Sequence, residues 1–320
     1  MDIANWYEIG LVWTSWLQTN LGFLEGLFRF VTNLNSTEAF LALFPFLYWC
    51  VDKRFGLHLS YIFLVTVGVN ATGKQLFRAP RPFWMEPDLA LAKELSYGFP
   101  SGHTQVATTL YFFAALWWRK TWLWVAMVIL FVLMAISRIY LGMHFPQDII
   151  GGFLLGVLVL VGYFGGWQRW LEPMLVERSG KEKVAIGLGL MVVMLGLFFA
   201  AQVGGYRDDS GPWVSFYEAA DLQVTEDMVS MVGVMMGLLV GWYFESRDLR
   251  FEVAGSWGKR LGRYVVGMVV TAVIWAGLGA IFPDEPLVLA LPLRALRYGL
   301  VGVWVAFGGP WLFVKLGWDK

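Results

Sequence analysis

The sequence predicts an all-α protein, a polytopic transmembrane helix bundle of about nine spans with one or two interfacial helices at its N-terminus. Of its 320 residues, 58% are hydrophobic and 15% are charged, against roughly 45–50% and about 25% in ordinary soluble domains. The apolar residues form blocks separated by short charged clusters, which is the pattern of bilayer-spanning helices. The formal net charge is zero, so no basic field indicates nucleic-acid binding. We therefore expect an integral membrane protein that has the bilayer as partner, and its oligomeric state stays open.

The N-terminal segment differs from the rest of the chain. Residues 6–32 are apolar and aromatic but are interrupted by Glu8, Gln18, Glu25 and Arg29, which favours helices lying in the membrane interface. No basic region precedes the first apolar stretch, so we expect no cleavable signal. The expected organisation is an interfacial segment at 1–36, a helical core at 37–167 and additional transmembrane helices at 168–320.

The candidate spans follow this interfacial segment. Pro45 lies inside the first of them and predicts a kinked or shallow helix there. Small residues one turn apart at Gly152 and Gly156 predict a close helix–helix contact in lipid. The expected spans lie at about 37–52, 57–73, 104–118, 121–140, 148–167, 184–203, 228–244, 264–282 and 297–315.

The charged loops predict the orientation. Most of the 24 Lys and Arg residues lie in loops of one face, including Arg119-Lys120 and the cluster around Lys181. Because positive residues accumulate on the cytoplasmic side, this face is expected to be cytoplasmic. The loops at 74–103 and 138–148 then face the periplasm or a lumen, and the C-terminus is cytoplasmic. A bacterial inner membrane or a eukaryotic endomembrane fits this arrangement.

Three short segments on the predicted outer face contain two of the three histidines of the chain. Cationic side chains at a membrane edge can simply extend to lipid headgroups, but that explanation does not account for the histidines. The segments run from Lys74 to Arg81-Pro82, across Pro100-Ser101-Gly102-His103, and from Ser137-Arg138 to His144 and Asp148.

These groups together fit phosphoryl transfer, which needs positive charge and donors around three phosphoryl oxygens. Lys74, Arg81 and Arg138 supply the charge, and the planar fork of arginine matches phosphate. Ser101 and Gly102 open a predicted helix, where backbone N–H groups and the Ser101 hydroxyl can point at an anion.

His144 and Asp148 are four residues apart, with Pro146 suited to a first helical turn between them. At this spacing the carboxylate can reach the imidazole Nδ1, set its tautomer and leave Nε2 as a nucleophile. His144 is therefore the candidate nucleophile.

In chain order, the three segments contain Lys, six residues and Arg-Pro; then Pro-Ser-Gly-His; then Ser-Arg, five residues, His, three residues and Asp. This pattern resembles the type 2 phosphatidic acid phosphatase superfamily. The resemblance implies that His144 forms a phosphohistidine, that Asp148 orients it and that His103 protonates the leaving group. It also implies no metal or cofactor and makes 37–167 the catalytic core. The implied phosphate ligands are Lys74, Arg81, Ser101, Gly102 and Arg138.

Residues 137–144 are particularly similar to the sphingosine-1-phosphate phosphatase and glucose-6-phosphatase branches. The former branch usually has Thr or Ser where Gly102 stands, which weakens assignment to that substrate. Residues 87–95 have helical apolar spacing and are expected to form an interfacial lid, which favours a lipid phosphate entering sideways.

Several functions remain open at this point. A lipid phosphate, an isoprenoid pyrophosphate or a soluble sugar phosphate would each suit the motifs. A phosphotransferase would pass the phosphoryl group to an alcohol instead of water. A transporter would explain the spans, but it would not explain a His–Asp pair and a second histidine among basic phosphate ligands.

Overall fold

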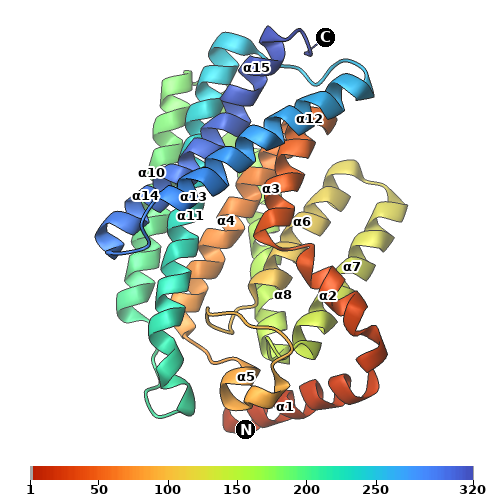
Figure 1. The fold of residues 1–320 in the computed structure, drawn as a ribbon, viewed down its shortest axis with the longest axis vertical. Helices are drawn as coiled ribbons and strands as arrows, with labels where there is room; N and C mark the ends of the chain where they lie inside the picture. Colours follow the sequence, from red (N-terminus) through yellow and green to blue (C-terminus); the bar gives the residue numbers. More distant parts are fainter. Residues whose placement is uncertain (1–2, 320) are drawn as a thin grey trace. The chain divides into compact units, whose positions relative to one another are not determined.

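The computed structural model describes residues 3–319 and contains only helices and loops in that range. The predicted all-α class is therefore confirmed (Figure 1). Within residues 3–319, 7 helical stretches are long and apolar enough to cross a membrane, or up to 8 if the bent pair Gly22–Asn33 and Thr37–Val51 forms one span. The 7 are Lys53–Met85, Thr121–Tyr140, Pro146–Val176, Gly180–Gly204, Pro212–Leu249, Trp257–Ile281 and Leu287–Lys315.

The expected count of about nine spans is not confirmed, and the difference has a physical reason. The span expected at 104–118 is helix α6, which runs from Gly102 to Trp118 and has 17 residues. At 1.5 Å per residue it is about 26 Å long, a little shorter than a hydrocarbon core of about 30 Å. The first expected span is α3 (Thr37–Phe46), which contains Pro45 and continues as a π-helical turn at Leu47–Val51.

The chain forms two compact units. The first consists of residues up to Ala39, Val65–Gly165 and Gly196–Thr225, and the second consists of Phe40–Leu64, Gly166–Leu195 and Glu226–Lys320. All of the predicted site residues belong to the first unit.

The first unit is built around three helices, α6, α7 (Thr121–Tyr140) and α8 (Pro146–Val161). Helix α6 packs against both of the others, and the C-terminal part of α4 (Lys53–Phe77) belongs to the same unit. The remaining elements are α1 (Ile3–Asn20), a 3₁₀ turn at Gly22–Leu24, α2 (Glu25–Asn33), α5 (Pro82–Met85), 3₁₀ turns at Pro87–Leu89 and Pro212–Phe216, and the adjoining parts of α10 and α11.

Glycines on α8 let it approach α6 closely, as the sequence predicts. A Cβ atom at Gly152 would lie 2.5 Å from the Ser101 carbonyl oxygen, and one at Gly156 would lie 2.6 Å from Cβ of Thr108. Real Cβ atoms essentially never come so near another heavy atom, so only glycine permits this crossing. The contact sets the start of α8 beside the start of α6, where the candidate histidines lie.

The N-terminal helices α1 and α2 lie against the same end of the first unit (Figure 1). Leu17 of α1 and Phe28 of α2 are buried in a cluster with Tyr140, Leu141 and Met143 at the end of α7. The other side of α1 is apolar and exposed, with Trp13 56% and Trp16 58% accessible. A helix with such an exposed aromatic face suits the membrane interface.

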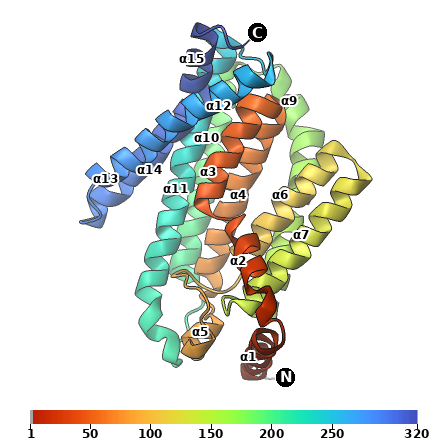
Figure 2. The ribbon, with the colours of Figure 1, turned by 45° about the vertical axis from the view of Figure 1, so that its right-hand side comes forward.

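The second unit contains the C-terminal helices. Helices α12 (Trp257–Ala272) and α13 (Leu278–Ile281) are joined by a π-helical turn at Val273–Gly277, and α14 (Leu287–Val303) and α15 (Gly309–Lys315) by one at Trp304–Gly308. These two composite helices run side by side (Figure 2). The other elements are α9 (Glu172–Val176), α10 (Gly180–Gly204), α11 (Tyr217–Phe244), π-helical stretches at Gly162–Leu171 and Glu245–Leu249, most of α3 and the first part of α4.

Small residues also bring helices together in the second unit. A Cβ atom at Gly237 of α11 would lie 2.0 Å from the carbonyl oxygen of Gly299 of α14. The fully buried Trp49 donates its indole N–H to the Val305 carbonyl at 2.9 Å. Lys53 forms an ion pair with the buried Glu245 at 2.7 Å. Close backbone contact and satisfied polar groups are what helix association in lipid requires.

Candidate active site

The candidate nucleophile and its carboxylate meet at the start of α8. Phe145 precedes the helix and Pro146 is its first residue, as predicted. Oδ2 of Asp148 accepts a hydrogen bond from the Phe145 amide at 2.9 Å and lies 3.3 Å from Nδ1 of His144. The side chains of His144 and Asp148 are 0% and 1% exposed. The four-residue spacing therefore brings the two groups into contact, as the sequence predicts.

The two ring nitrogens of His144 have different neighbours. Nδ1 faces the Asp148 carboxylate, while Nε2 lies 3.3 Å from Nη1 of Arg81. A tautomer with its hydrogen on Nδ1 satisfies both contacts, since Nε2 then accepts from the guanidinium. Burial lowers the pKa of His144 well below its usual value, and the charges of Arg81 and Arg138 lower it further. A neutral imidazole with a lone pair on Nε2 is the form that can attack phosphorus.

Arg81 is the most highly connected cation of the site. Its side chain is 0% exposed, and it donates to the carbonyl oxygens of Met143 at 2.9 Å, Tyr97 at 3.0 Å and Ser96. The Ser96 hydroxyl accepts from Arg81 at 3.1 Å and from Nζ of Lys74 at 2.7 Å. The Ser96 hydroxyl thus holds Arg81 and Lys74, two of the predicted phosphate ligands, beside each other.

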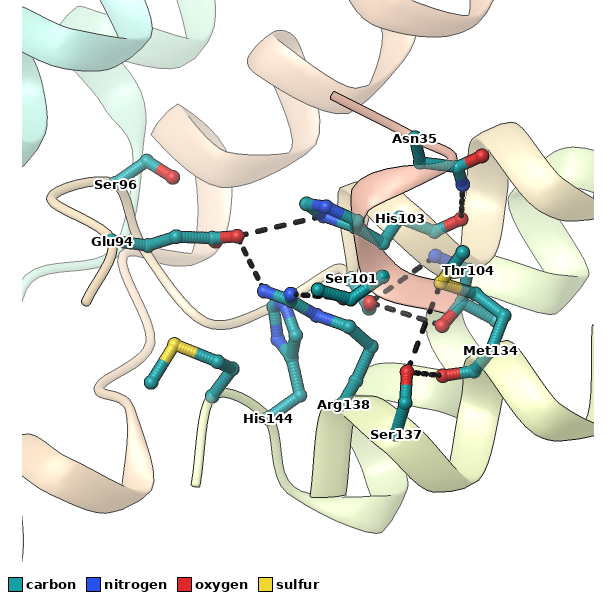
Figure 3. A network of polar contacts seen from close by, with 12 residues as sticks. Asn35, Glu94, Ser96, Ser101, His103, Thr104, Met134, Ser137, Arg138 and His144 are labelled. Carbon is teal, nitrogen blue, oxygen red and sulfur yellow. Dashed lines mark hydrogen bonds and ion pairs between the residues drawn. The ribbon is translucent and has the colours of Figure 1, made fainter. Parts of the chain in front are cut away.

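Arg138 comes from the last turn of α7 and is 2% exposed. Its Nη1 donates to the hydroxyl of Thr32 in α2 at 2.8 Å, and its Nη2 is paired with Glu94. Asn35, just after α2, donates to the carbonyl oxygen of His103 at 3.0 Å. The N-terminal segment therefore supports both Arg138 and the helix start that contains His103. Figure 3 shows the second of these contacts, from Asn35 to His103.

Ser101 caps α6, which begins at Gly102 instead of near residue 104. The Ser101 hydroxyl accepts from the Thr104 amide at 3.4 Å and contacts the Thr104 hydroxyl at 3.0 Å, and the Ser101 amide donates to the Asp148 carbonyl at 3.0 Å. The donors of Ser101 are thus engaged within the protein here. A Cβ atom at Gly102 would lie 3.1 Å from Oδ1 of Asn70, so a larger residue at this position would press on that amide.

His103 lies across from His144 in the same cluster, with its side chain 23% exposed. Its Nδ1 is 3.5 Å from Oε1 of Glu94. Figure 3 shows Glu94 entering from the loop before α6 and reaching toward both His103 and Arg138. Glu94 is also paired with Arg81, at 2.7 Å from Nη2.

Glu94, Ser96 and Thr32 were not predicted as site residues, and the helix predicted for part of the loop is wrong. The expected helical lid at 87–95 is helical only at Pro87–Leu89, and the rest is irregular chain. Directly after this segment, the carbonyl oxygens of Ser96 and Tyr97 accept from Arg81, so they are engaged outside any helix. An acidic residue between two basic motifs was the only signal that could have pointed to Glu94.

These observations define a class: a polytopic helical membrane protein with a buried His–carboxylate pair, a second histidine and three converging cations. Residues 36–171 match the family model of the PAP2 superfamily, the type 2 phosphatidic acid phosphatases, and residues 229–320 match that of the PAP2 superfamily phosphatase transmembrane extension. The chain belongs to the PAP2 superfamily. The resemblance identified from the three motifs is thereby confirmed.

Individual relatives have different substrates in their names. The chain is 24% identical to mouse sphingosine-1-phosphate phosphatase 2 over 68% of this chain and 59% of the relative. It is 27% identical to rat glucose-6-phosphatase 3 over 84% of this chain and 85% of the relative. It is 29% identical to the undecaprenyl-diphosphatase of Sulfolobus acidocaldarius over 43% of this chain and 76% of the relative. No solved structure matches the chain.

Proposed function

We propose that this protein is a membrane phosphatase that hydrolyses a phosphate monoester or pyrophosphate of a lipid through a phosphohistidine on His144. The observation that carries the proposal is the orientation of His144: Nδ1 faces Asp148 at 3.3 Å, and Nε2 faces the guanidinium of Arg81 at 3.3 Å. A phosphoryl group bound by Arg81 would replace the contact between the guanidinium and Nε2, and it would then lie beside the lone pair of Nε2.

In the first step of the proposed reaction, Nε2 of His144 attacks phosphorus and the bond to the leaving oxygen breaks. The departing alkoxide takes a proton from the imidazolium form of His103, which is left neutral. Burial and the charge of Arg138 lower the pKa of His103 to about 3, and the negative phosphate of the substrate would have to raise it for this step. In the second step, water attacks the phosphohistidine and gives a proton to His103, the P–N bond breaks and inorganic phosphate leaves. Asp148 stabilises the positive charge that develops on the His144 ring in the first step.

The cations of the site would hold the phosphoryl oxygens through both steps. Arg81 and Arg138 are buried, and charge-assisted hydrogen bonds are stronger in such surroundings. Lys74 is linked to Arg81 through Ser96, so the three charges converge on one region. At the start of α6, the Gly102 amide would complete this set as a donor at a helix N-terminus. The Ser101 hydroxyl would join it by turning away from Thr104, which it contacts here.

A lipid substrate is favoured by the setting of the site. The helices α1 and α2 both contact α7, and α1 also contacts α5. Both have exposed aromatic residues suited to the interface. Sphingosine-1-phosphate phosphatase 2 and undecaprenyl-diphosphatase, two of the relatives, are named for lipid phosphates. The loops at 74–103 and 138–148 would open to the periplasm or a lumen, with the C-terminus in the cytoplasm.

A sugar phosphate is the second candidate substrate, because the alignment with glucose-6-phosphatase 3 covers 84% of this chain. Phosphate release should be measured on purified protein with a sphingoid phosphate, an isoprenoid pyrophosphate and glucose 6-phosphate. His144→Ala serves as the blank, and His58→Ala, which changes a histidine of the second unit, serves as the matched control. Activity on a lipid alone supports the proposal, while hydrolysis of glucose 6-phosphate alone would replace it with the second candidate.

A further inference from the structure

Glu94 occupies the region in which phosphoryl oxygens are expected. One carboxylate oxygen lies 2.7 Å from Nη2 of Arg81, and the other is paired with Nη2 of Arg138 and lies 3.5 Å from Nδ1 of His103. Two oxygens of one anion thus contact two of the three proposed phosphate-binding cations and the proposed acid (Figure 3). A phosphoryl group with the same partners could not bind while the carboxylate remains there.

The exposed fractions of Glu94 and of the two arginines differ. Arg81 and Arg138 are 0% and 2% exposed, whereas Glu94 is 26% exposed. Of these three side chains, only that of Glu94 therefore reaches the surface. Burial acts to raise the pKa of Glu94, but the charges of Arg138 and Arg81 outweigh it and hold the pKa well below its usual range. The group is thus an anion at neutral pH.

The chain around Glu94 is held at its ends and less firmly in between. The Leu91 amide donates to the Leu141 carbonyl at 3.3 Å, and the carbonyl of Ser96 accepts from Arg81. Among the residues that the structure describes, residues 92–95 make no backbone–backbone hydrogen bond. Ala92 packs against the cluster of Leu17 and Phe28, whereas Lys93 and Leu95 are exposed. The ion pairs of the Glu94 side chain are therefore the main restraint on residues 93–95, and losing them frees this segment to move.

We propose that Glu94 is a built-in competitive ligand of the phosphate site, displaced when the substrate binds and returning as inorganic phosphate leaves. It keeps the buried arginines paired between turnovers, because an uncompensated buried charge is costly. By competing for the same cations, Glu94 also favours the release of inorganic phosphate. This inference rests on the proposed phosphatase function, because that function identifies phosphate as the anion that exchanges with Glu94.

The direction in which the inhibition constant of phosphate changes separates this role from a structural one. Glu94→Gln removes the competing charge, so the inhibition constant of inorganic phosphate should fall by about tenfold or more, as expected when a mostly closed site becomes open. The KM should fall with it, without a rise in kcat. Glu86→Gln, an exposed acid of the same loop, should change neither constant. If Glu94 only positions the arginines, Glu94→Gln would raise both constants, and that result overturns the proposal.

A second measurement follows the segment around Glu94 in the wild-type protein. If phosphate displaces Glu94, orthovanadate or inorganic phosphate should accelerate tryptic cleavage after Lys93 in the wild-type protein, while cleavage after the exposed Lys181 stays constant. Protection of Lys93 by either anion would contradict displacement. Arg138→Ala should abolish the effect of the anions on Lys93.

Direct phosphate titration of the wild type, Glu94→Gln and Arg138→Ala distinguishes failure of this proposal from failure of the function. If phosphate binding is lost in Arg138→Ala but does not tighten in Glu94→Gln, only the proposed role of Glu94 is overturned. If phosphate binds no better to the wild type than to Arg138→Ala, the phosphate site itself is wrong, and the proposed function falls with it.

Discussion

At the residue scale, the central unit of the molecule is a histidine with two different neighbours. Asp148 sets one nitrogen of His144, and Arg81 faces the other. The contact between His144 and Asp148 could be predicted from the sequence, because Pro146 indicates a helix start and a side chain of the first turn can reach back to the residues just before it. The ligands Glu94 and Ser96 could not be predicted, because they come from irregular chain whose path depends on tertiary contacts with Arg81.

Asp148→Asn tests the carboxylate. The substitution keeps the size of the side chain but removes the charge that stabilises the reacting imidazole ring, so kcat should fall by about 100-fold or more without reaching the level of His144→Ala. Steady-state phosphate release from equal amounts of folded protein is the measurement. Activity within about twofold of the wild type would show that Asp148 has only a packing role.

His103 can be tested by the leaving group of the substrate. General acid catalysis contributes about 10²–10⁴-fold, and the gain shrinks when the leaving group is a weak base. His103→Ala should therefore impair hydrolysis of an alkyl phosphate far more than that of a nitrophenyl phosphate. His144→Ala should impair both equally. Equal losses for the two esters in His103→Ala would mean that His103 positions phosphate without donating a proton.

Thr32 links the N-terminal segment to the site through its 2.8 Å hydrogen bond to Arg138. Hydrogen bonds to charged groups contribute about 1.5–3 kcal/mol, so Thr32→Val should lower kcat/KM by about tenfold or more. Thr19→Val removes an exposed hydroxyl of α1 and is the matched control. An unchanged kcat/KM in Thr32→Val would exclude a contribution of α2 to catalysis.

At the element scale, the close contact of α6 and α8 positions the two histidines. The glycine pattern on α8 was readable from the sequence because small residues one turn apart indicate close packing. The short helix α6 was expected at 104–118 and differs only in its start, at Gly102. The bend between α2 and α3 could not be predicted, since hydropathy reports how apolar a helix is and does not report where it bends. The expected span 121–140, by contrast, coincides with α7 (Thr121–Tyr140), whose apolar run is uninterrupted.

Gly156→Ala tests the helix contact. Its new Cβ would lie 2.6 Å from Cβ of Thr108, whereas no atom lies within 4 Å of the Cβ position at Gly162. Overpacking of this kind costs about 1–3 kcal/mol, so Gly156→Ala should lower the thermal midpoint in detergent and Gly162→Ala should not. Equal midpoints for the two variants would show that the helices separate without penalty.

At the scale of the whole molecule, the sequence predicted an integral membrane protein, and the apolar helices confirm it. The orientation remains a prediction from loop charge. In a Cys50→Ser background, Lys93→Cys should react with an impermeant thiol reagent added outside intact cells, and Lys181→Cys should react only after permeabilisation. Lys93 and Lys181 are both exposed, so accessibility within the protein does not bias the comparison. The reverse labelling pattern would place the candidate site in the cytoplasm.

The most direct test of the account is to trap the covalent intermediate. Protein mixed with a ³²P-labelled lipid phosphate and quenched within milliseconds should carry label that survives alkali and is lost in acid, as a phosphoramidate is, and peptide mapping should assign it to His144. His144→Ala should carry none, and His58→Ala should carry as much as the wild type. Label on another residue, or turnover by the wild type together with equal turnover by His144→Ala, would contradict the phosphohistidine mechanism.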